Sequence, residues 1–192
     1  MNNIIYADYD EEGVFVYQAF KPKIVAVAIQ LNKFGKGFGI DRISWIKPSL
    51  GWMLRRSKYA SKHRMEAIAR IKLSHASWLE ILHQSIPTHF DDKRFSDENE
   101  WQSALKNSDV IHQWDPERSL KGERLDRQAI QIGLRGDVLK KYKDEYVIGV
   151  EDITELAKSI EYSTKKRQPF PSDIPTEKEY LINKNLKFNL GY

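Results

Sequence analysis

The chain has 192 residues, of which 41% are hydrophobic and 30% are charged, so it is long enough to bury one core and too short for two domains of ordinary size. The absence of cysteine excludes disulfides, thiolate metal sites and cysteine nucleophiles. No run approaches the roughly 18 apolar residues of a membrane span, and the N-terminal MNNIIYADYD carries acids where a signal peptide carries lysines. We therefore expect a cytoplasmic protein with no membrane partner, and a monomer by default.

Positive charge is concentrated in one part of the chain, which we call the basic segment. From Lys33 to Lys72 there are eleven Lys and Arg residues against two acidic ones, a net charge of +9, whereas the remainder has a net charge of −5. A local field of one sign raises the concentration of phosphorylated ligands. The segment also contains Trp45, Trp52 and Tyr59, on which bases can stack. One hypothesis is therefore a non-catalytic nucleic-acid-binding module that uses residues 33–72.

The N-terminal part of the chain predicts a strand that leads directly into a helix. Residues 14–20 are β-branched and aromatic and follow the turn-forming Glu-Glu-Gly, which favours a strand. Pro22 suits the first turn of a helix, and apolar residues continue at helical spacing until Gly35.

A second strand and helix follow a glycine-rich loop at residues 35–39. Residues 42–46 predict the strand, which Pro48 stops. Ser49 can cap a helix that runs to about Tyr59.

The rest of the chain alternates helices and strands. The predicted strands cover residues 67–73, 110–114, 129–134 and 145–150, and the predicted helices cover 74–84, 96–105, 137–142 and 152–160. Asp152 and Glu155 have capping-box spacing at the start of the last helix. Three prolines after Ser163 predict an extended tail. We therefore expect an α+β fold, with one domain over residues 1–162 and an extended segment over residues 163–192 that packs on it.

Several common sites are not supported by the motifs. The five histidines show no HExxH or paired metal spacing, so we expect no metal site. No GxSxG sequence is present, and Gly35-Lys36-Gly37 lacks the Lys-Ser/Thr that completes a P-loop. This glycine loop follows a helix, whereas the dinucleotide-binding loop of a Rossmann fold joins a strand to a helix.

Three short stretches resemble, in their order, the ADP-ribosyltransferase superfamily, which includes poly(ADP-ribose) polymerases and bacterial ADP-ribosylating toxins. The first is Val16-Tyr17-Gln18-Ala19-Phe20 before a helix that ends at a glycine. The second is Gly35-Lys36-Gly37 before Arg42-Ile43-Ser44-Trp45-Ile46, and the third is Asp144-Glu145-Tyr146-Val147-Ile148. In the superfamily these positions hold a Tyr-His-Gly type strand, a strand with an aromatic residue against nicotinamide, and a strand with the catalytic glutamate.

The whole chain also resembles an uncharacterised family, the domain of unknown function family 4291. The resemblance rests on Val-Tyr-Gln-Ala, Trp-Ile-Lys-Pro-Ser, the segment Gln113-Trp-Asp-Pro-Glu-Arg118 and the segment Ile130-Gln-Ile-Gly-Leu134. It covers nearly the full length and implies no activity.

The superfamily resemblance implies a mixed, mostly antiparallel split sheet with flanking helices, and an enzyme that cleaves NAD as its substrate. It would transfer ADP-ribose to an acceptor, with RNA or DNA as one candidate. The implied catalytic residues are Glu145, Gln18 and Trp45. The implied NAD-binding residues are Tyr17, Gln18, Arg42, Trp45, Lys47, Ser49, Arg55, Arg56 and Gln131.

Each of these residues also has a plainer interpretation. In a strand, Glu145 would face away from the core, where a fixed anion could stabilise the oxocarbenium charge that forms as the nicotinamide–ribose bond breaks. The alternative is a solvated glutamate on an edge strand. Gln18 stands where the superfamily has histidine; it can hydrogen-bond a ribose, but it cannot titrate, and it could equally be satisfied within a sheet. Trp45 could stack on a ring or pack in the core.

The charged candidates are equally open. Lys47, Arg55 and Arg56 could hold a pyrophosphate, because arginine forks match phosphate oxygens, or they could form a solvated basic face. Asp115, Glu117 and Arg118 lie on a predicted turn, where charged residues either act in function or pair with each other. Gln131 is the weakest candidate of the set.

Overall fold

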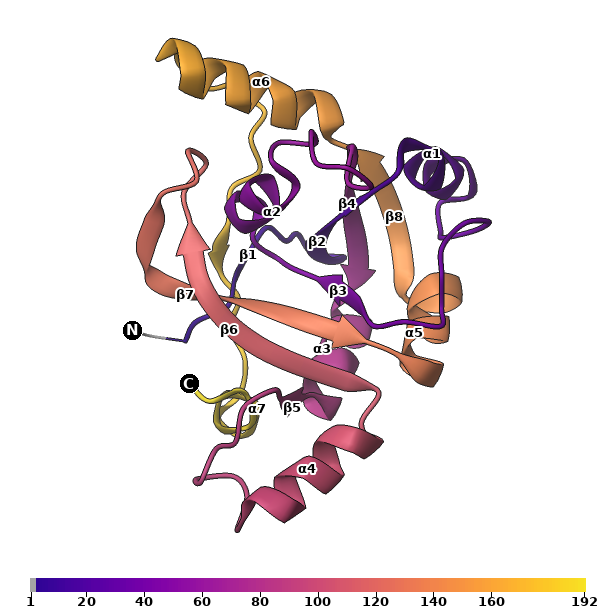
Figure 1. Cartoon of the computed structure of the whole chain (residues 1–192), viewed down its shortest axis with the longest axis vertical. Helices are drawn as coiled ribbons and strands as arrows, with labels where there is room; N and C mark the ends of the chain where they lie inside the picture. Colours follow the sequence, from indigo (N-terminus) through magenta and orange to yellow (C-terminus); the bar gives the residue numbers. More distant parts are fainter. Residues whose placement is uncertain (1–2) are drawn as a thin grey trace.

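A computed structural model describes residues 3–192, which form a single α+β domain with helices around three mostly antiparallel sheets (Figure 1). None of the helices in this part of the chain has the length and apolarity that crossing a bilayer requires. Helix α6 lies at one end of the molecule and α4 at the other, with the sheets between them.

The first sheet has the order β2-β4-β8 and is antiparallel throughout. Its strands are β2 (Gly13–Phe20), β4 (Ala67–Ser74) and β8 (Val147–Asp152). Val14 pairs with Leu73 and Phe20 with Ala67, so the strand predicted over 14–20 is confirmed. Because β2 is buried on both faces, it is a continuous apolar run in the sequence.

The second sheet has the order β3-β7-β6-β5. Its strands are β3 (Ser44–Ile46), β7 (Arg124–Leu134), β6 (Val110–Arg118) and β5 (Ile86–Pro87), and only β5 with β6 is a parallel pair. The backbone N–H of Tyr17 donates to the carbonyl of Lys47 at 2.7 Å, which joins β2 to the end of β3. The first two sheets therefore meet at β2 and β3.

Seven α-helices and one π-helical turn, η1, surround the sheets within residues 3–192. Their bounds are α1 (Pro22–Leu31), α2 (Leu50–Ser57), α3 (His75–Gln84), α4 (Glu98–Asn107), α5 (Gly136–Lys141), η1 (Tyr142–Tyr146), α6 (Thr154–Lys166) and α7 (Lys184–Leu190). Ser49 caps α2 as predicted, since its Oγ accepts from the Trp52 N–H at 3.0 Å. A second apolar cluster, which includes Tyr17, Leu54 and Ile160, packs apart from the main core.

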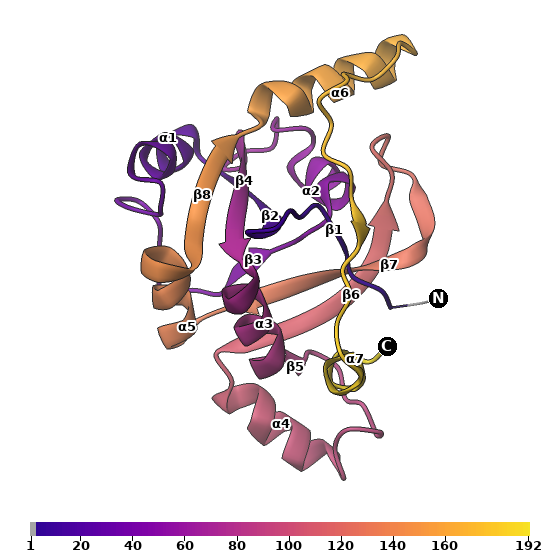
Figure 2. The same ribbon diagram turned by 180° about the vertical axis from the view of Figure 1, so that it is seen from behind.

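The C-terminal segment returns across the domain to the N-terminus. Strand β9 (Lys178–Glu179) pairs with β1 (Tyr6–Ala7) to form the third sheet. Figure 2 shows this segment running down one face from α6 to α7. The prediction of an extended tail is therefore incomplete, because α6 continues to Lys166 and α7 forms where Asn183 caps a new helix.

Two other predictions differ from the structure. The strand predicted over 145–150 begins only at Val147, because residues 142–146 continue α5 as a π-helical turn. The capping box at Asp152 is wrong, since the N-cap of α6 is Ile153; Asp152 instead accepts from the Thr154 N–H at 2.8 Å.

Candidate functional site

A cavity of about 870 Å³ opens where β2 meets β3, and we call it the basic cavity. Its walls come from β2, β3, α2, the loop over residues 58–66 and the two long strands β6 and β7. The predicted site residues that line it are Gln18, Arg42, Trp45, Lys47, Arg56 and Gln131. The fold thus brings together residues that lie more than a hundred positions apart in the chain.

Gln18 lines the cavity but is already fully engaged. Its Nε2 donates to Ser44 Oγ and to the carbonyl of Trp45, each at 2.9 Å, and its Oε1 accepts from the Tyr142 hydroxyl at 2.8 Å. The side chain is 4% exposed. Gln18 therefore links β2 to β3 and to η1. Its hydrogen bonds are made within the protein, which is the plainer of the two interpretations of this residue.

Tyr17 does not line the cavity. Successive side chains of a strand point to opposite faces, so Tyr17 faces the second apolar cluster and has no exposed surface. Its hydroxyl is buried without a hydrogen-bond partner. The side chain of Tyr17 therefore does not reach the cavity, where the resemblance implied that it would contact nicotinamide.

Trp45 lines the cavity, and its indole ring lies beside a glycine of the neighbouring strand. It pairs with Gly133 of β7, and a Cβ at Gly133 would stand 3.1 Å from the Trp45 ring and 2.8 Å from Ile111. A side chain at position 133 would therefore push the indole away. The indole is half-buried, which leaves part of its surface for a planar ligand.

Lys47 is a buried cation in the cavity wall. It is 5% exposed, and its ammonium lies 4.3 Å from the centroid of the Trp52 ring. Burial lowers the pKa of Lys47 to about 7, and the charge of Arg56 acts in the same direction, while Asp115 opposes them. A buried ammonium with an aromatic contact and no carboxylate partner is costly, and a ligand anion would offset that cost.

The rim of the cavity carries further cations that form no ion pair among residues 3–192. These are Arg42, Arg56, Lys62 and Arg64. None of the residues that line the cavity in this part of the chain is acidic. The basic cavity is therefore positively charged without internal compensation.

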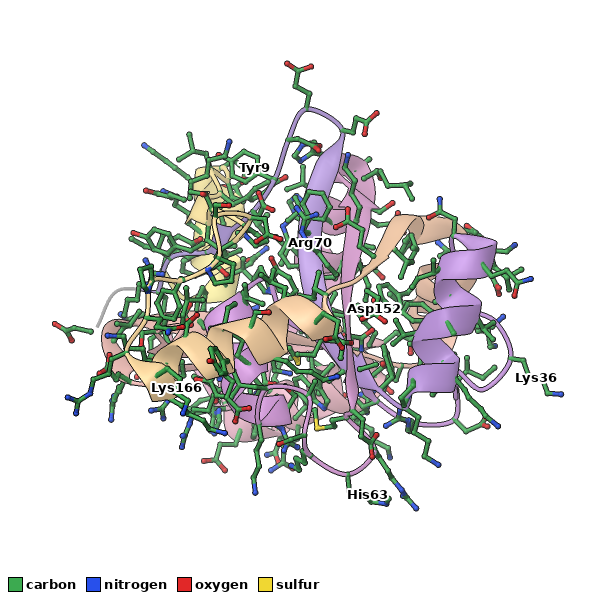
Figure 3. The ribbon with its side chains drawn as sticks, turned by 90° about the horizontal axis from the view of Figure 1, so that it is seen from above. Tyr9, Lys36, His63, Arg70, Asp152 and Lys166 are labelled. Atoms are coloured by element: carbon green, nitrogen blue, oxygen red, sulfur yellow. The ribbon has the colours of Figure 1, made fainter. Side chains whose placement is uncertain are left out.

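The loop over residues 58–66 has an unusual backbone that places the rim cations. Lys58, Tyr59 and Ala60 have φ of 52°, 52° and 63°, and Arg64 has φ of 65°. Left-handed conformations are unfavourable for residues other than glycine, and consecutive ones persist only where the surroundings fix them. Here the Ala60 N–H donates to Ser57 Oγ at 3.2 Å. Figure 3 shows His63 at the outer edge of this loop.

A second depression of about 470 Å³, the side groove, shares Trp52, Arg56 and Lys62 with the basic cavity. It contains Arg55, which is a predicted site residue outside the basic cavity, and Asp115. Asp115 connects the two spaces, because its carboxylate accepts hydrogen bonds from the amides of Gln113 and Gln131.

The remaining predicted residues have other roles or positions. Glu145 lies in η1 and is exposed, and it does not line the basic cavity, so its expected place in a strand facing a shared cleft is wrong. Ser49 is 1% exposed and donates to Glu117 Oε1 at 2.6 Å while it caps α2. Sequence reasoning named Trp52 only as a stacking residue of the nucleic-acid hypothesis, and it did not single out Lys62 or Arg64, although both lie in the basic segment.

A family model of the Domain of unknown function (DUF4291) matches residues 4–180. The chain belongs to the DUF4291 family. The match includes every residue of the basic cavity and the side groove, while α7 lies beyond it. Among curated proteins, none matches the sequence. The function of this DUF4291 domain is therefore argued from its site.

Proposed function

We propose that the basic cavity binds a phosphorylated nucleotide, and that NAD is the first ligand to test. The observation that carries the proposal is the set of unpaired cations around a cavity that also holds Trp45 and Trp52. Phosphate oxygens match guanidinium and ammonium donors, and a planar base or nicotinamide stacks on an indole.

The positions of the donors suit the parts of a nucleotide. Lys47 and Arg56 interact electrostatically and both face the cavity, so one diphosphate could neutralise both. Gln131 lies on β7 and lines the cavity; its Nε2 donates to Asp115, and its Oε1 is left to accept from a ribose hydroxyl or a carboxamide. Gln18 contributes to the wall, but a ligand contact would have to replace one of its present hydrogen bonds.

We propose ADP-ribosyl transfer as the enzymatic form of this function, with Asp115 in the role that the resemblance gave to Glu145. In such a reaction nicotinamide leaves with the electrons of the N-glycosidic bond, and the acceptor forms the new bond and releases its proton. Positive charge develops on the ribose, and a fixed carboxylate stabilises it. Asp115 lies in the side groove and is held by the amides of two residues that line the basic cavity, whereas Glu145 is exposed elsewhere.

A second candidate function is binding of a single strand of RNA or DNA along the basic cavity and the side groove. The two spaces are continuous through Arg56 and Lys62, and the side groove adds Arg55, Lys58 and Arg118. If about six cations met phosphates, affinity would fall roughly a thousandfold between 50 and 200 mM salt. Binding of one nucleotide would depend far less on salt, so a salt titration separates the two functions.

Isothermal titration calorimetry with NAD and ADP tests the nucleotide proposal. The wild type should bind both, and Arg56→Gln should lower the affinity about tenfold, which corresponds to loss of one charged hydrogen bond. Lys36→Gln is the matched control, because Lys36 belongs to the same basic segment, is exposed, and points away from the molecule in Figure 3. Equal losses in the two variants, or no binding by the wild type, would reject the nucleotide site.

Nicotinamide release from NAD tests the enzymatic form. Asp115→Asn should slow release at least a hundredfold, as expected for loss of a charge-stabilising group, while Glu145→Gln should leave the rate unchanged. The reverse result would restore Glu145. If the wild type binds NAD and releases no nicotinamide with any acceptor, the transfer reaction fails and the binding site stands.

A further inference from the structure

A smaller cavity of about 230 Å³ lies at the far end of β6 from the side groove, and we call it the Arg94 cavity. The loop between β5 and α4 forms one wall, His112 of β6 forms the floor, and Gly191 after α7 closes one side. The nucleotide proposal makes no use of this cavity.

The half-exposed guanidinium group of Arg94 lies in this cavity, 5.5 Å from the centroid of the neighbouring Phe95 ring, and it has no acidic partner within the described residues. In the part of the chain that the structure describes, Arg94 Nη1 is buried and donates no hydrogen bond, and the guanidinium forms no ion pair. Burial lowers the pKa of Arg94. The charge of the nearby Asp91 opposes this effect, and Asp91 Oδ1 accepts from the Lys93 N–H at 3.1 Å. A buried Nη1 with no hydrogen-bond acceptor is unfavourable, and an anion in the site would supply the acceptor.

His112 presents a hydrogen-bond acceptor to the same cavity. The Ser85 hydroxyl donates to the carbonyl of Leu82 at 2.9 Å, so it must accept from His112 Nδ1, which lies 2.9 Å from it. The neutral ring is then protonated at Nδ1, and Nε2 carries a lone pair that has no hydrogen-bond partner among residues 3–192. Burial, with a smaller effect of the Arg94 charge, lowers the pKa of His112 to about 3, so the ring is neutral near pH 7.

We propose that the Arg94 cavity binds a singly protonated phosphate group, either free phosphate or a small phosphate monoester. The charged oxygens would accept from the Arg94 guanidinium, and the P–OH group would donate to His112 Nε2. One donor group and one acceptor group beside each other match an oxyanion that carries one proton. A fully ionised oxyanion of the same size could accept hydrogen bonds from Arg94. It would have no proton to donate to His112 Nε2, so the lone pairs of the oxyanion and of Nε2 would face each other.

This matching predicts a dependence on pH. The second pKa of a phosphate monoester is about 6, so the monoanion is lost as the pH rises to 8. The titratable groups around the site are Asp91, His89 and Arg94, and the partner of His112 on the opposite side is the uncharged Ser85. The affinity for a phosphate monoester should therefore be about fiftyfold higher at pH 6 than at pH 8.

A titration of the full chain with inorganic phosphate, followed by the Arg94 Nε–Hε resonance in ¹H–¹⁵N NMR spectra, tests the proposal in the wild type. Phosphate at pH 6 should shift this resonance to saturation, and sulfate, which carries no proton at this pH, should bind at least tenfold more weakly. Glycerol phosphate in a parallel titration distinguishes a monoester from the free ion by the tighter affinity. An Arg94 resonance that stays in place, or that responds equally to sulfate and phosphate, would overturn the proposal.

Variants give an independent readout by calorimetry in the Arg56→Gln background, which weakens the basic cavity. Arg94→Gln should lower the remaining phosphate affinity at least tenfold, while Lys93→Gln, which removes an exposed charge one residue away, should change it less than twofold. If Arg94→Gln does not fold, the wild-type resonance still decides. Failure of this proposal would leave the nucleotide site unaffected, because the two cavities share only Gln113 in their linings.

Discussion

The C-terminal end and the middle of the basic segment use their positive charges in different ways. At its C-terminal end, Arg70 donates to Glu151 at 2.6 Å and to Asp8, and Lys72 forms ion pairs with Asp10 and Glu12. In Figure 3 Arg70 lies among the strands, away from His63 on the cavity loop.

In the middle of the same segment the cations are left without acids. Lys47, Arg56, Lys62 and Arg64 face the basic cavity, and no ion pair compensates them within residues 3–192. The net charge of the segment thus combines a set of structural ion pairs with a set of cations that are free for a ligand. Pairing, and not sequence density, decides which cations belong to a site.

The largest expected effect is the loss of ligand affinity in the Lys47→Met variant. Removal of a buried cation from the cavity wall should lower NAD affinity about a hundredfold, the upper end for one charged hydrogen bond. Lys72→Met is the matched control on the ion-paired side and should leave the affinity within twofold of the wild type. Calorimetry measures both, and a loss of similar size in Lys72→Met would remove the distinction between the middle of the basic segment and its C-terminal end.

The same Lys47→Met variant should be more stable than the wild type. The pKa of Lys47 in the folded chain, about 7, lies below its ordinary value of 10.5. Charging Lys47 therefore costs stability increasingly as the pH falls from 10.5 to 7, and the full cost is present below pH 7. We expect a gain on the order of 2 kcal/mol at pH 6 in urea unfolding, and little gain at pH 10.

Arg70→Gln should show the opposite pattern. Its guanidinium is largely buried, with 16% of the side chain exposed, and lies 3.4 Å from the centroid of the Phe15 ring. Loss of the group would leave Asp8 without its partner, so unfolding should become easier by about 2 kcal/mol. NAD affinity should not change by more than twofold, and a variant that keeps its stability and loses NAD would contradict the structural role.

The pH dependence of NAD binding sharpens the comparison further. Lys47 with a pKa near 7 is mostly charged at pH 6 and mostly neutral at pH 8. Affinity for NAD, whose pyrophosphate keeps a constant charge over this range, should fall up to about tenfold between these values. The Lys47→Met variant should show a flat profile; a wild-type profile that is equally flat would mean that Lys47 does not contact the anion.

The smallest expected effect concerns Glu177, whose carboxyl group lies at the N-terminal end of α2. Glu177 accepts from the Leu50 N–H at 2.6 Å, and burial raises the pKa of Glu177 to about 8. Its ionisation costs no stability below the ordinary value of 4.5 and the full cost above pH 8. Glu177→Gln keeps an acceptor, so it should stabilise the chain by about 1 kcal/mol at pH 8.5 and by much less at pH 5. Equal effects at both pH values would show that the carboxyl is solvated.

Local pattern was enough to predict most strands and helices. Residues 14–20 and the Ser49 cap have strong local signals, and both are confirmed. Glu145 was misplaced because the sequence 145–150 fits a strand, while the π-helical turn before it depends on Tyr142, which is buried and bonded to Gln18. Contacts of this kind between distant parts of the chain leave no local signal.

The candidate site was predicted in part for the same reason. The superfamily resemblance and the density of cations identified Trp45, Lys47 and Arg56, which the structure brings together. The sequence could not show that Arg70 is paired, because its partners Asp8 and Glu151 lie far away in the chain. Nor could it show that a left-handed loop carries Arg64 to the cavity rim, since none of its residues with positive φ is a glycine.

The most direct test of the central claim is a crystal structure of the protein with NAD or ADP. The diphosphate should lie in the basic cavity, within hydrogen-bond distance of Lys47 and Arg56, with a ring against Trp45 or Trp52. A nucleotide bound near Arg70 and Lys72, or at no defined position at saturating concentration, would contradict the claim that the unpaired cations form the site.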